Sequence, residues 1–201
     1  MFEWMAGFIE RTGYLGVALL MFAENLFPPI PSELIMPLAG FQAARGDLHI
    51  LPVVLAGTLG SWAGAGLWYW VGLRLGGERI RRLAARHGRW LTVSPDEVDN
   101  ACAWFRRHCG KAVFFGRLVP TVRTLISVPA GVASMALPKF LLYSAAGTAL
   151  WTAALGGAGY ALEDRFQDVA GWVNPMSNVV VGALVLWYLY RVVTFRRHEA
   201  P

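Results

Sequence analysis

The sequence has few residues of the kinds that build metal centres or bind nucleotides. Its two cysteines and four histidines do not show the spacing of metal ligands. It contains no Gly-rich loop ending in Lys-Ser or Lys-Thr, so direct use of ATP is not expected. A lipid-phosphate phosphatase would need a pair of histidines within the membrane, and the histidines here fall in predicted loops or at helix ends. We therefore expect no metal, no cofactor and no enzymatic activity.

Charged residues are scarce as well. They make up 15% of the 201 residues, whereas 56% are hydrophobic and the mean hydropathy is +0.44. This composition is typical of an integral membrane protein and predicts one membrane domain over 1–201. The net charge of +5 comes largely from basic residues beside apolar stretches, which favours contact with anionic lipid headgroups and argues against binding of nucleic acid.

Three apolar stretches are long enough to cross about 30 Å of hydrocarbon as single helices. They cover 51–73, 140–162 and 173–193. The first is followed by a run of arginines, namely Arg74, Arg79, Arg81, Arg82, Arg86 and Arg89. Because basic residues gather on the cytoplasmic side of a membrane, we expect 74–110 to be cytoplasmic. Further arginines after the third stretch predict a cytoplasmic C-terminus.

The cytoplasmic connection is expected to be a basic loop followed by an amphipathic helix. The helix is predicted over 92–109, with Ser94 and Pro95 at its start and arginines at its end. Such a helix suits the membrane interface. The N-terminal stretch 2–9 is a candidate for the same role.

Two other apolar stretches, 14–41 and 113–135, are interrupted by prolines. Proline removes a backbone donor and clashes with the preceding turn, so it favours two short helices separated by a break. We predict a re-entrant helical hairpin in each stretch. The prolines expected at the breaks are Pro28, Pro29, Pro31 and Pro120.

These elements together predict an all-α integral membrane fold. Each hairpin and the span after it, 51–73 or 140–162, would form one unit. The two units would enter the membrane from opposite sides, with 173–193 as an additional C-terminal helix. Inverted repeats of this kind place a transport site at their junction near the membrane midplane.

The interrupted stretches also carry charges, which are acidic in the first and basic in the second. Glu24 and Glu33 lie in 14–41, and Arg117 and Arg123 lie in 113–135. Four charges facing lipid would cost on the order of 10 kcal/mol, so they must face protein, water or a ligand. We therefore predict that the two stretches meet around an anionic substrate.

The chemistry of these residues suggests a role for each set. Arg117 and Arg123 would bind phosphate, because a guanidinium stays charged when it is removed from water and donates in a planar fork. Glu24 and Glu33 would exchange protons and so couple transport to a proton gradient. Alternatively, the arginines would only bridge the glutamates and hold the hairpins together. The candidate accessory residues are Asn25, Ser32, Tyr69 and Thr124.

Two signatures in these stretches resemble the DedA family of bacterial inner-membrane proteins, also called the VTT-domain or SNARE-associated family. The more specific one reads Phe115-x-Arg117-x-x-Pro120-x-x-Arg123-Thr124, followed by Gly131, Met135 and Phe140. The other reads Glu24-Asn25, then Pro31-Ser32-Glu33. The match covers about 14–160. Many members carry an aspartate in the first span where this chain has Ala65, and whether Asp47 takes part instead is left open.

The resemblance implies two facing re-entrant hairpins and a role in moving lipids across the bacterial inner membrane, notably in recycling undecaprenyl phosphate. The leading hypothesis is a proton-coupled flippase for this lipid, with protons and membrane lipids as further partners and a homo-oligomer left open. The alternatives are a flippase or scramblase for a phospholipid such as phosphatidylethanolamine, a small-oxyanion transporter, and a structural or assembly protein.

Overall fold

The computed structural model describes residues 2–27, 32–91, 95–120, 122–162 and 190. The regular structure within these residues is helical, which confirms the all-α prediction for this part of the chain. The helices are α1 (Phe2–Thr12), α2 (Tyr14–Leu26), α3 (Ser32–Ala44), α4 (Ile50–Leu91), α5 (Pro95–Arg117), α6 (Ser127–Val132) and α7 (Leu137–Ala161). The predicted span 173–193 lies outside the described residues except for Tyr190.

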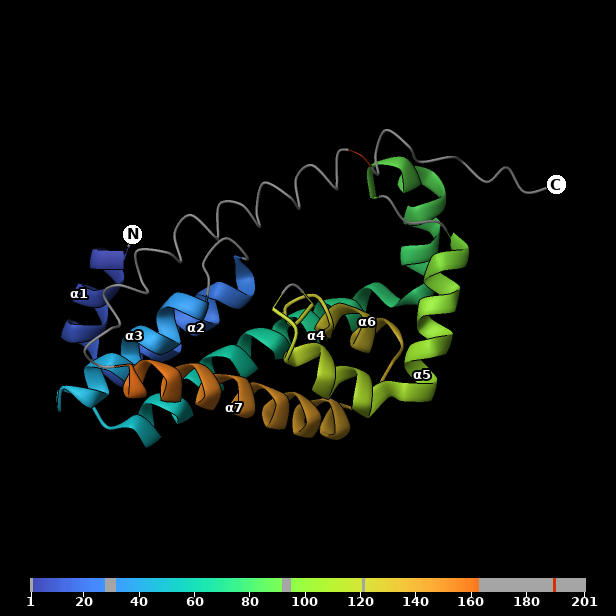
Figure 1. Cartoon of the computed structure of the whole chain (residues 1–201). Coiled ribbons are helices and arrows are strands. Elements are labelled where there is room, and N and C mark those ends of the chain that lie inside the picture. Colours follow the sequence, from blue (N-terminus) through green and yellow to red (C-terminus); the bar gives the residue numbers. More distant parts are fainter. Residues whose placement is uncertain (1, 28–31, 92–94, 121, 163–189, 191–201) are drawn as a thin grey trace.

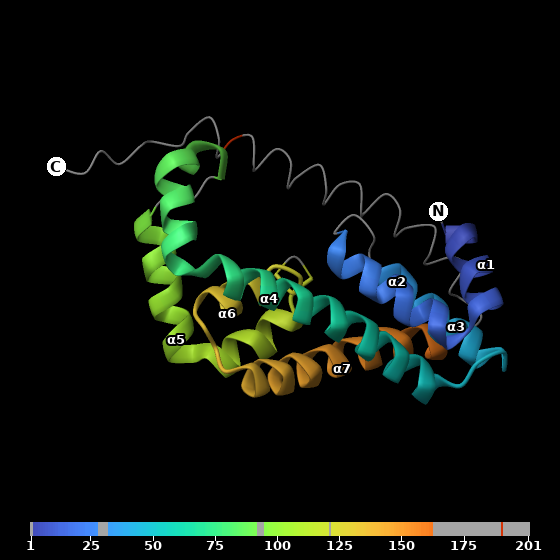
Figure 2. The same ribbon diagram turned by 180° about the vertical axis from the view of Figure 1, so that it is seen from behind.

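Two long helices form the frame of the molecule. Figures 1 and 2 show α7 running along the first part of α4 in the opposite chain direction. At one end, α2 packs on α4 and α3 packs on α7. At the other end, α5 lies beside the last part of α4, and α6 packs on the same helix. The end of α2 and the turns between α5 and α6 lie near each other in the middle of the frame (Figures 1 and 2).

Helix α4 is longer than the predicted span 51–73. It has 42 residues and includes 74–91, so the prediction of a basic loop there is wrong. Arginine, leucine and alanine are good helix formers, and the sequence offers no proline after Pro52 until Pro95. Gly76 has a φ of 66°, and α4 bends before its last part (Figure 1). A residue without a side chain adopts this backbone conformation readily.

The outer face of α4 is apolar. Leu51, Leu55 and Leu59 are each more than half exposed, at 68%, 54% and 59%. Ile50–Arg82 is the one helix in the described part of the chain that is long and apolar enough to cross a membrane by length and composition. Helix α7 occupies most of the predicted span 140–162, but its buried face carries hydroxyl residues, which lower its hydropathy.

The helix that enters the second interrupted stretch is longer than predicted. Residues 113–117 belong to the last turns of α5, which begins at Pro95 and continues beyond the predicted end of the amphipathic helix. Turns occupy the described residues of 118–126, and α6 has six residues. The sequence has no proline between Pro95 and Pro120, so nothing removes a backbone donor from the helix where it continues past residue 109.

Helix α1 is attached to the bundle rather than lying apart from it. Met5 and Ile9 are buried in a core cluster with residues of α2 and α3, whereas Trp4 is 64% exposed. The predicted helix over 2–9 is therefore present. The prediction did not include the packing of one face of this helix on the rest of the protein.

Candidate functional site

The last turn of α2 lies against α4 through a buried amide. Asn25 Nδ2 donates to Ser61 Oγ of α4 at 2.7 Å and to Glu24 Oε2 at 3.2 Å. Trp68 Nε1 of α4 donates to the backbone oxygen of Asn25 at 2.7 Å. Glu24 and Asn25 are 4% and 1% exposed. These bonds fix the carboxylate of Glu24 near the C-terminal end of α2.

Arg123 comes from the turns between α5 and α6 and meets this carboxylate. Its Nη2 forms an ion pair with Glu24 Oε1, and Arg123 is 4% exposed. Its guanidinium also lies over the ring of Trp151 in α7, at 5.9 Å from the ring centroid. The two interrupted stretches therefore meet at one buried ion pair.

Arg117 is the last residue of α5 and is 2% exposed. Its Nη2 donates to Ser127 Oγ at the start of α6 at 2.7 Å, and its Nε has no hydrogen-bond partner among the described residues. No carboxylate in the described part of the chain lies within ion-pair distance of Arg117. A buried cation without an acidic partner is costly, so the site is suited to receive an anion.

The other predicted residues are placed less centrally. Ser32 opens α3 and is fully buried, with an Oγ that has no hydrogen-bond partner among the described residues. Glu33, beside it, is half-buried and forms no ion pair within the described ranges. Thr124 is half-buried, and Pro120 is exposed in the turns after α5. Three of the expected break residues, Pro28, Pro29 and Pro31, lie outside the described residues.

Tyr69 has a clear packing role. Its hydroxyl donates to the backbone oxygen of Met135, and its ring stacks on Phe140 at a centroid distance of 4.5 Å. It is 4% exposed, which differs from the interfacial position that aromatic residues often take. Ala65 is buried in the same cluster, and Asp47 is exposed in the link between α3 and α4.

Sequence reasoning missed several polar residues around the two arginines. Ser61 accepts a hydrogen bond from Asn25, and Ser127 accepts one from Arg117. In α7, the ring of Trp151 lies beneath Arg123, and Ser144 and Thr148 are buried. A signal was present in the sequence, because hydroxyl residues recur every four positions at 144, 148 and 152 in an apolar stretch. That spacing places them on one helix face.

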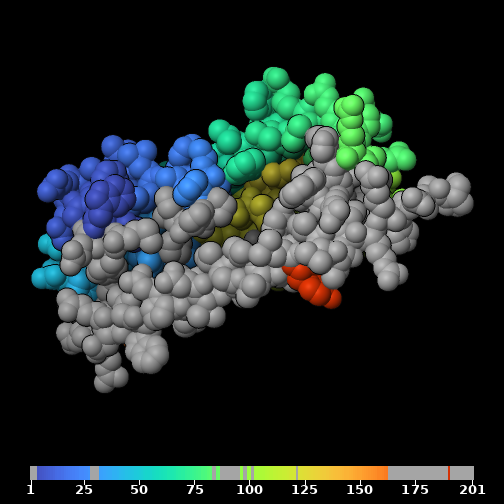
Figure 3. Space-filling view, turned by 90° about the horizontal axis from the view of Figure 1, so that it is seen from above, coloured from blue at the N-terminus to red at the C-terminus, as the bar shows by residue number. Residues whose placement is uncertain are grey.

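Among the residues that the structure describes, the buried charges do not balance. Glu24 supplies one negative charge, and Arg117 and Arg123 supply two positive charges, all 4% exposed or less. The space-filling view shows the olive surface of the α6 region between the blue of α2 and the green of α4 (Figure 3). The site thus lies where both interrupted stretches meet the long helices, and its chemistry favours an anion.

Comparison with known proteins identifies the family to which the chain belongs. A model of the VTT domain matches residues 30–161. A protein of Lactococcus lactis subsp. cremoris named alkaline phosphatase-like protein is 40% identical over 93% of this chain and 88% of its own length. Undecaprenyl phosphate transporter A of Staphylococcus aureus is 30% identical over 94% of this chain and 93% of its own. The Bacillus subtilis protein of the same name is 28% identical over 94% and 91%.

No solved structure matches this chain. The VTT-domain match covers about two thirds of the sequence and includes the whole segment from α3 to α7. The chain therefore belongs to the VTT-domain family of membrane proteins, also called the DedA family.

Proposed function

We propose that this chain moves undecaprenyl phosphate across the bacterial inner membrane. The observation that carries the proposal is the buried Glu24–Arg123 ion pair, which joins the two interrupted stretches beside the unbalanced charge of Arg117. The Staphylococcus and Bacillus relatives named undecaprenyl phosphate transporter A support the choice of lipid. The exposed leucines of α4 fit a lipid-facing surface, along which a polyprenyl tail would stay.

In this mechanism the phosphate takes the place of Glu24 as the partner of Arg123. Arg117 binds the same phosphate, since a guanidinium forms paired, charge-assisted hydrogen bonds with phosphate oxygens. Proton uptake by Glu24 removes the charge that competes with the phosphate. Glu33, in the first turn of α3, takes part in the same proton exchange.

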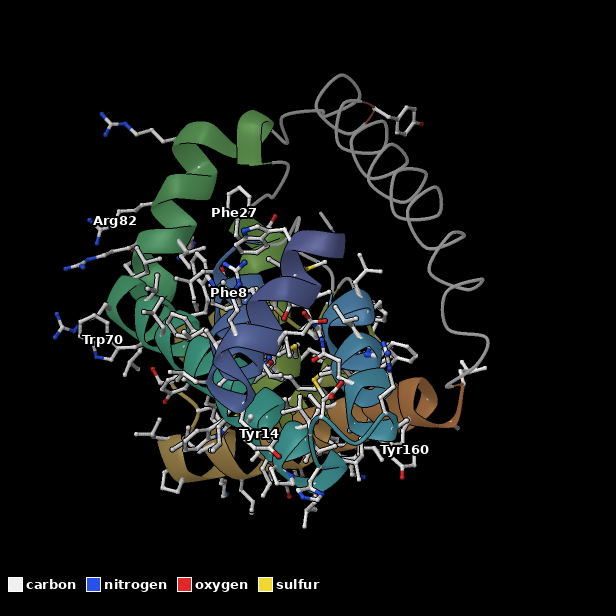
Figure 4. All side chains as sticks on the ribbon, turned by 90° about the vertical axis from the view of Figure 1, so that its left-hand side faces the viewer. Phe8, Tyr14, Phe27, Trp70, Arg82 and Tyr160 are labelled. Carbon is white, nitrogen blue, oxygen red and sulfur yellow. The ribbon has the colours of Figure 1, made fainter. Side chains whose placement is uncertain are left out.

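The proposal includes the membrane arrangement. The two interrupted stretches are re-entrant, and with α4 and α7 they form inverted units whose junction is the site. The chain crosses the membrane several times, and the arginines of α4 and the C-terminus face the cytoplasm. In Figure 4 the side chains of Trp70 and Arg82 point away from the other helices, as expected of side chains that contact lipid and headgroups.

Transport by purified protein in proteoliposomes tests the proposal. Undecaprenyl phosphate is placed in both leaflets, and a membrane-impermeant enzyme measures how fast lipid reaches the outer leaflet. We expect Arg117→Gln and Arg123→Gln each to slow movement roughly 10- to 100-fold, since each loses hydrogen bonds to a charged group worth about 1.5–3 kcal/mol.

Arg82→Gln is the matched control, because it removes the same charge from an exposed position. Arg82 is paired only loosely with Glu78, at 3.7 Å, and both side chains are mostly exposed. Its transport rate should equal that of the unmodified protein. Normal rates in both buried variants, with correct folding shown by thermal unfolding, would disprove the proposal.

The same assay separates the alternatives. Release of inorganic phosphate would indicate hydrolysis, the reaction suggested by the name of the Lactococcus relative. If phosphatidylethanolamine or a small oxyanion moves faster than undecaprenyl phosphate, that molecule is the substrate instead. A purely structural role predicts that Glu24→Arg combined with Arg123→Glu restores function fully, whereas the transport mechanism predicts that the reversed pair restores folding only.

A further inference from the structure

The buried face of α7 carries polar groups that neither the ion pair nor the Arg117 hydrogen bond uses. Ser144 is fully buried and Thr148 is 2% exposed. Among the described residues, Ser144 Oγ, Thr148 Oγ1 and Trp151 Nε1 are buried and have no hydrogen-bond partner. About nine in ten buried polar groups in proteins are paired, so three unpaired groups within two turns of one helix need an explanation.

These three residues, which we call the α7 polar face, lie on the part of α7 that contacts both arginines. Their spacing of four and three residues places them on one side of the helix. Gly147, on the same side, lies against Arg117, because a Cβ there would be 2.8 Å from Arg117 Cβ. Trp151 lies under the guanidinium of Arg123, with 5.9 Å between its ring centroid and Cζ. The α7 polar face therefore flanks the proposed phosphate site.

The next turn of α7 shows that its hydroxyls can be paired. Thr152 Oγ1 donates to the backbone oxygen of Thr148 at 3.0 Å and lies 2.8 Å from Thr58 Oγ1 of α4. A hydroxyl in a helix commonly bonds to the carbonyl four residues earlier in this way. Thr148 and Ser144, at the level of the arginines, do not.

We propose that the α7 polar face donates hydrogen bonds to the phosphate held by Arg117 and Arg123 and makes the site prefer a phosphate monoester over a phosphodiester. This inference rests on the proposed function. The unpaired groups, together with Arg117 Nε, all act as donors toward an oxyanion. A terminal phosphate offers three free oxygens with about two acceptor positions each, whereas a diester offers two such oxygens.

The preference for a monoester follows from the number of hydrogen-bond donors at the site. Arg117 Nε, Arg123 and the α7 polar face supply at least five donors at one location. Two diester oxygens accept about four hydrogen bonds, so one buried donor would stay unpaired. A site that leaves a buried donor unpaired binds such a ligand more weakly.

Binding to the purified full chain in detergent tests this inference. The probes are a fifteen-carbon polyprenyl monophosphate and a short-chain phosphatidylethanolamine. Ser144→Ala, Thr148→Val and Trp151→Phe each remove one donor, and Trp151→Phe keeps a ring under Arg123. We expect each to weaken monophosphate binding roughly tenfold and to leave diester binding nearly unchanged.

Thr152→Val is the matched control, because it makes the same change as Thr148→Val one turn later, where the hydroxyl is already paired. It should bind the monophosphate like the unmodified protein. Unchanged monophosphate binding in both Ser144→Ala and Thr148→Val would overturn the inference. If the unmodified protein binds the monophosphate and Arg123→Gln does not, that result leaves the proposed function standing; if the folded, unmodified protein fails to bind it, both fail.

Discussion

At the scale of single residues, the site combines one carboxylate with two guanidinium groups, all of them buried. Asn25 fixes Glu24 from the α4 side, and Ser127 accepts a hydrogen bond from Arg117. Removing one partner from a buried charge pair commonly costs about 3–5 kcal/mol, so a change at Glu24 or Arg123 affects folding as well as transport. Variants that keep the size and the oxygen of the side chain are therefore the informative ones.

Glu24→Gln tests the proposed proton exchange. The amide keeps an oxygen toward Arg123 but cannot gain or lose a proton, so transport by this variant should change less with pH than transport by the unmodified protein, with Glu33 as the remaining proton-exchanging group. The measurement is the transport rate between about pH 7 and pH 8.5, above the second pKa of a phosphate monoester near 6. In the unmodified protein we expect faster transport at the lower pH, since protonation of Glu24 releases Arg123. An equal pH dependence in both proteins would contradict the mechanism.

At the scale of elements, both interrupted stretches approach the long helices closely. Gly40 of α3 faces the backbone of Gly156 in α7, and Gly131 of α6 faces the backbone of Tyr69 in α4. A Cβ at either position would lie 2.0 Å from a carbonyl oxygen, which flexible side chains cannot relieve. These contacts hold the short elements, and through them the arginines, against the frame.

Gly131→Ala should therefore displace α6 from α4. Overpacking of this kind costs about 1–3 kcal/mol, and α6 supplies Ser127, the partner of Arg117. We expect transport to fall more than tenfold, since a misplacement of about 1 Å costs on the order of 100-fold in rate. Thermal unfolding and proteoliposome transport provide the measurements.

Gly66→Ala in α4 is the control for this change. A Cβ at Gly66 would meet nothing within 4 Å, so the helix should gain up to about 1 kcal/mol of stability and transport should persist. Equal transport by Gly131→Ala and Gly66→Ala would show that the close contact of α6 does not position the site.

At the scale of the whole molecule, the frame separates an apolar part from a basic part. The first part of α4 exposes leucines, whereas its last part exposes the described arginines Arg74, Arg79, Arg81, Arg82 and Arg86. Arg74 lies over the ring of Trp70, with 4.2 Å between Cζ and the ring centroid. Such a pair suits the boundary between tails and headgroups, so the bend at Gly76 falls near the proposed membrane surface.

The proposed orientation predicts that Cys102 is labelled from the cytoplasmic side. A membrane-impermeant maleimide should react with a Cys109→Ser variant in inside-out vesicles and not in right-side-out vesicles. Burial raises the pKa of the Cys102 thiol, although Arg106 partly offsets the effect. Because the thiolate is the reactive form, labelling should be slow near neutral pH and accelerate as the pH rises. Labelling in right-side-out vesicles alone would place α5 outside the cell.

Much of this organisation could be predicted from chemistry that is local in the sequence. The prolines predicted that each interrupted stretch contains more than one helix, and α2 and α3, like α5 and α6, are separate helices. The cost of burying charge predicted that the acidic and basic stretches meet, as Glu24 and Arg123 do. The partner of Arg117 could not be predicted in this way. It is Ser127, a neutral residue ten positions away whose approach depends on the packing of α6.

The length of α4 and the position of α7 were also beyond local reasoning. Arginines 74–89 fit a charged loop as well as a helix, and helix formation there coincides with packing between α4 and α5. Hydroxyl residues in an apolar stretch look like ordinary packing residues until their neighbours are known. Gly147 gives no sign in the sequence that it lies against Arg117.

The unbalanced charge of Arg117 has a consequence for the response of the proposed transporter to voltage. Glu24 and Arg123 cancel each other when paired, so the unloaded site carries one net positive charge. In the loaded site Glu24 is protonated and neutral, and a phosphate monoester above its second pKa near 6 carries about two negative charges, which balance the two arginines and bring the sum to zero. Moving one elementary charge through 100 mV changes the free energy by about 2.3 kcal/mol. The membrane potential would therefore act mainly on the return of the unloaded transporter and would leave the lipid-loaded step nearly unaffected.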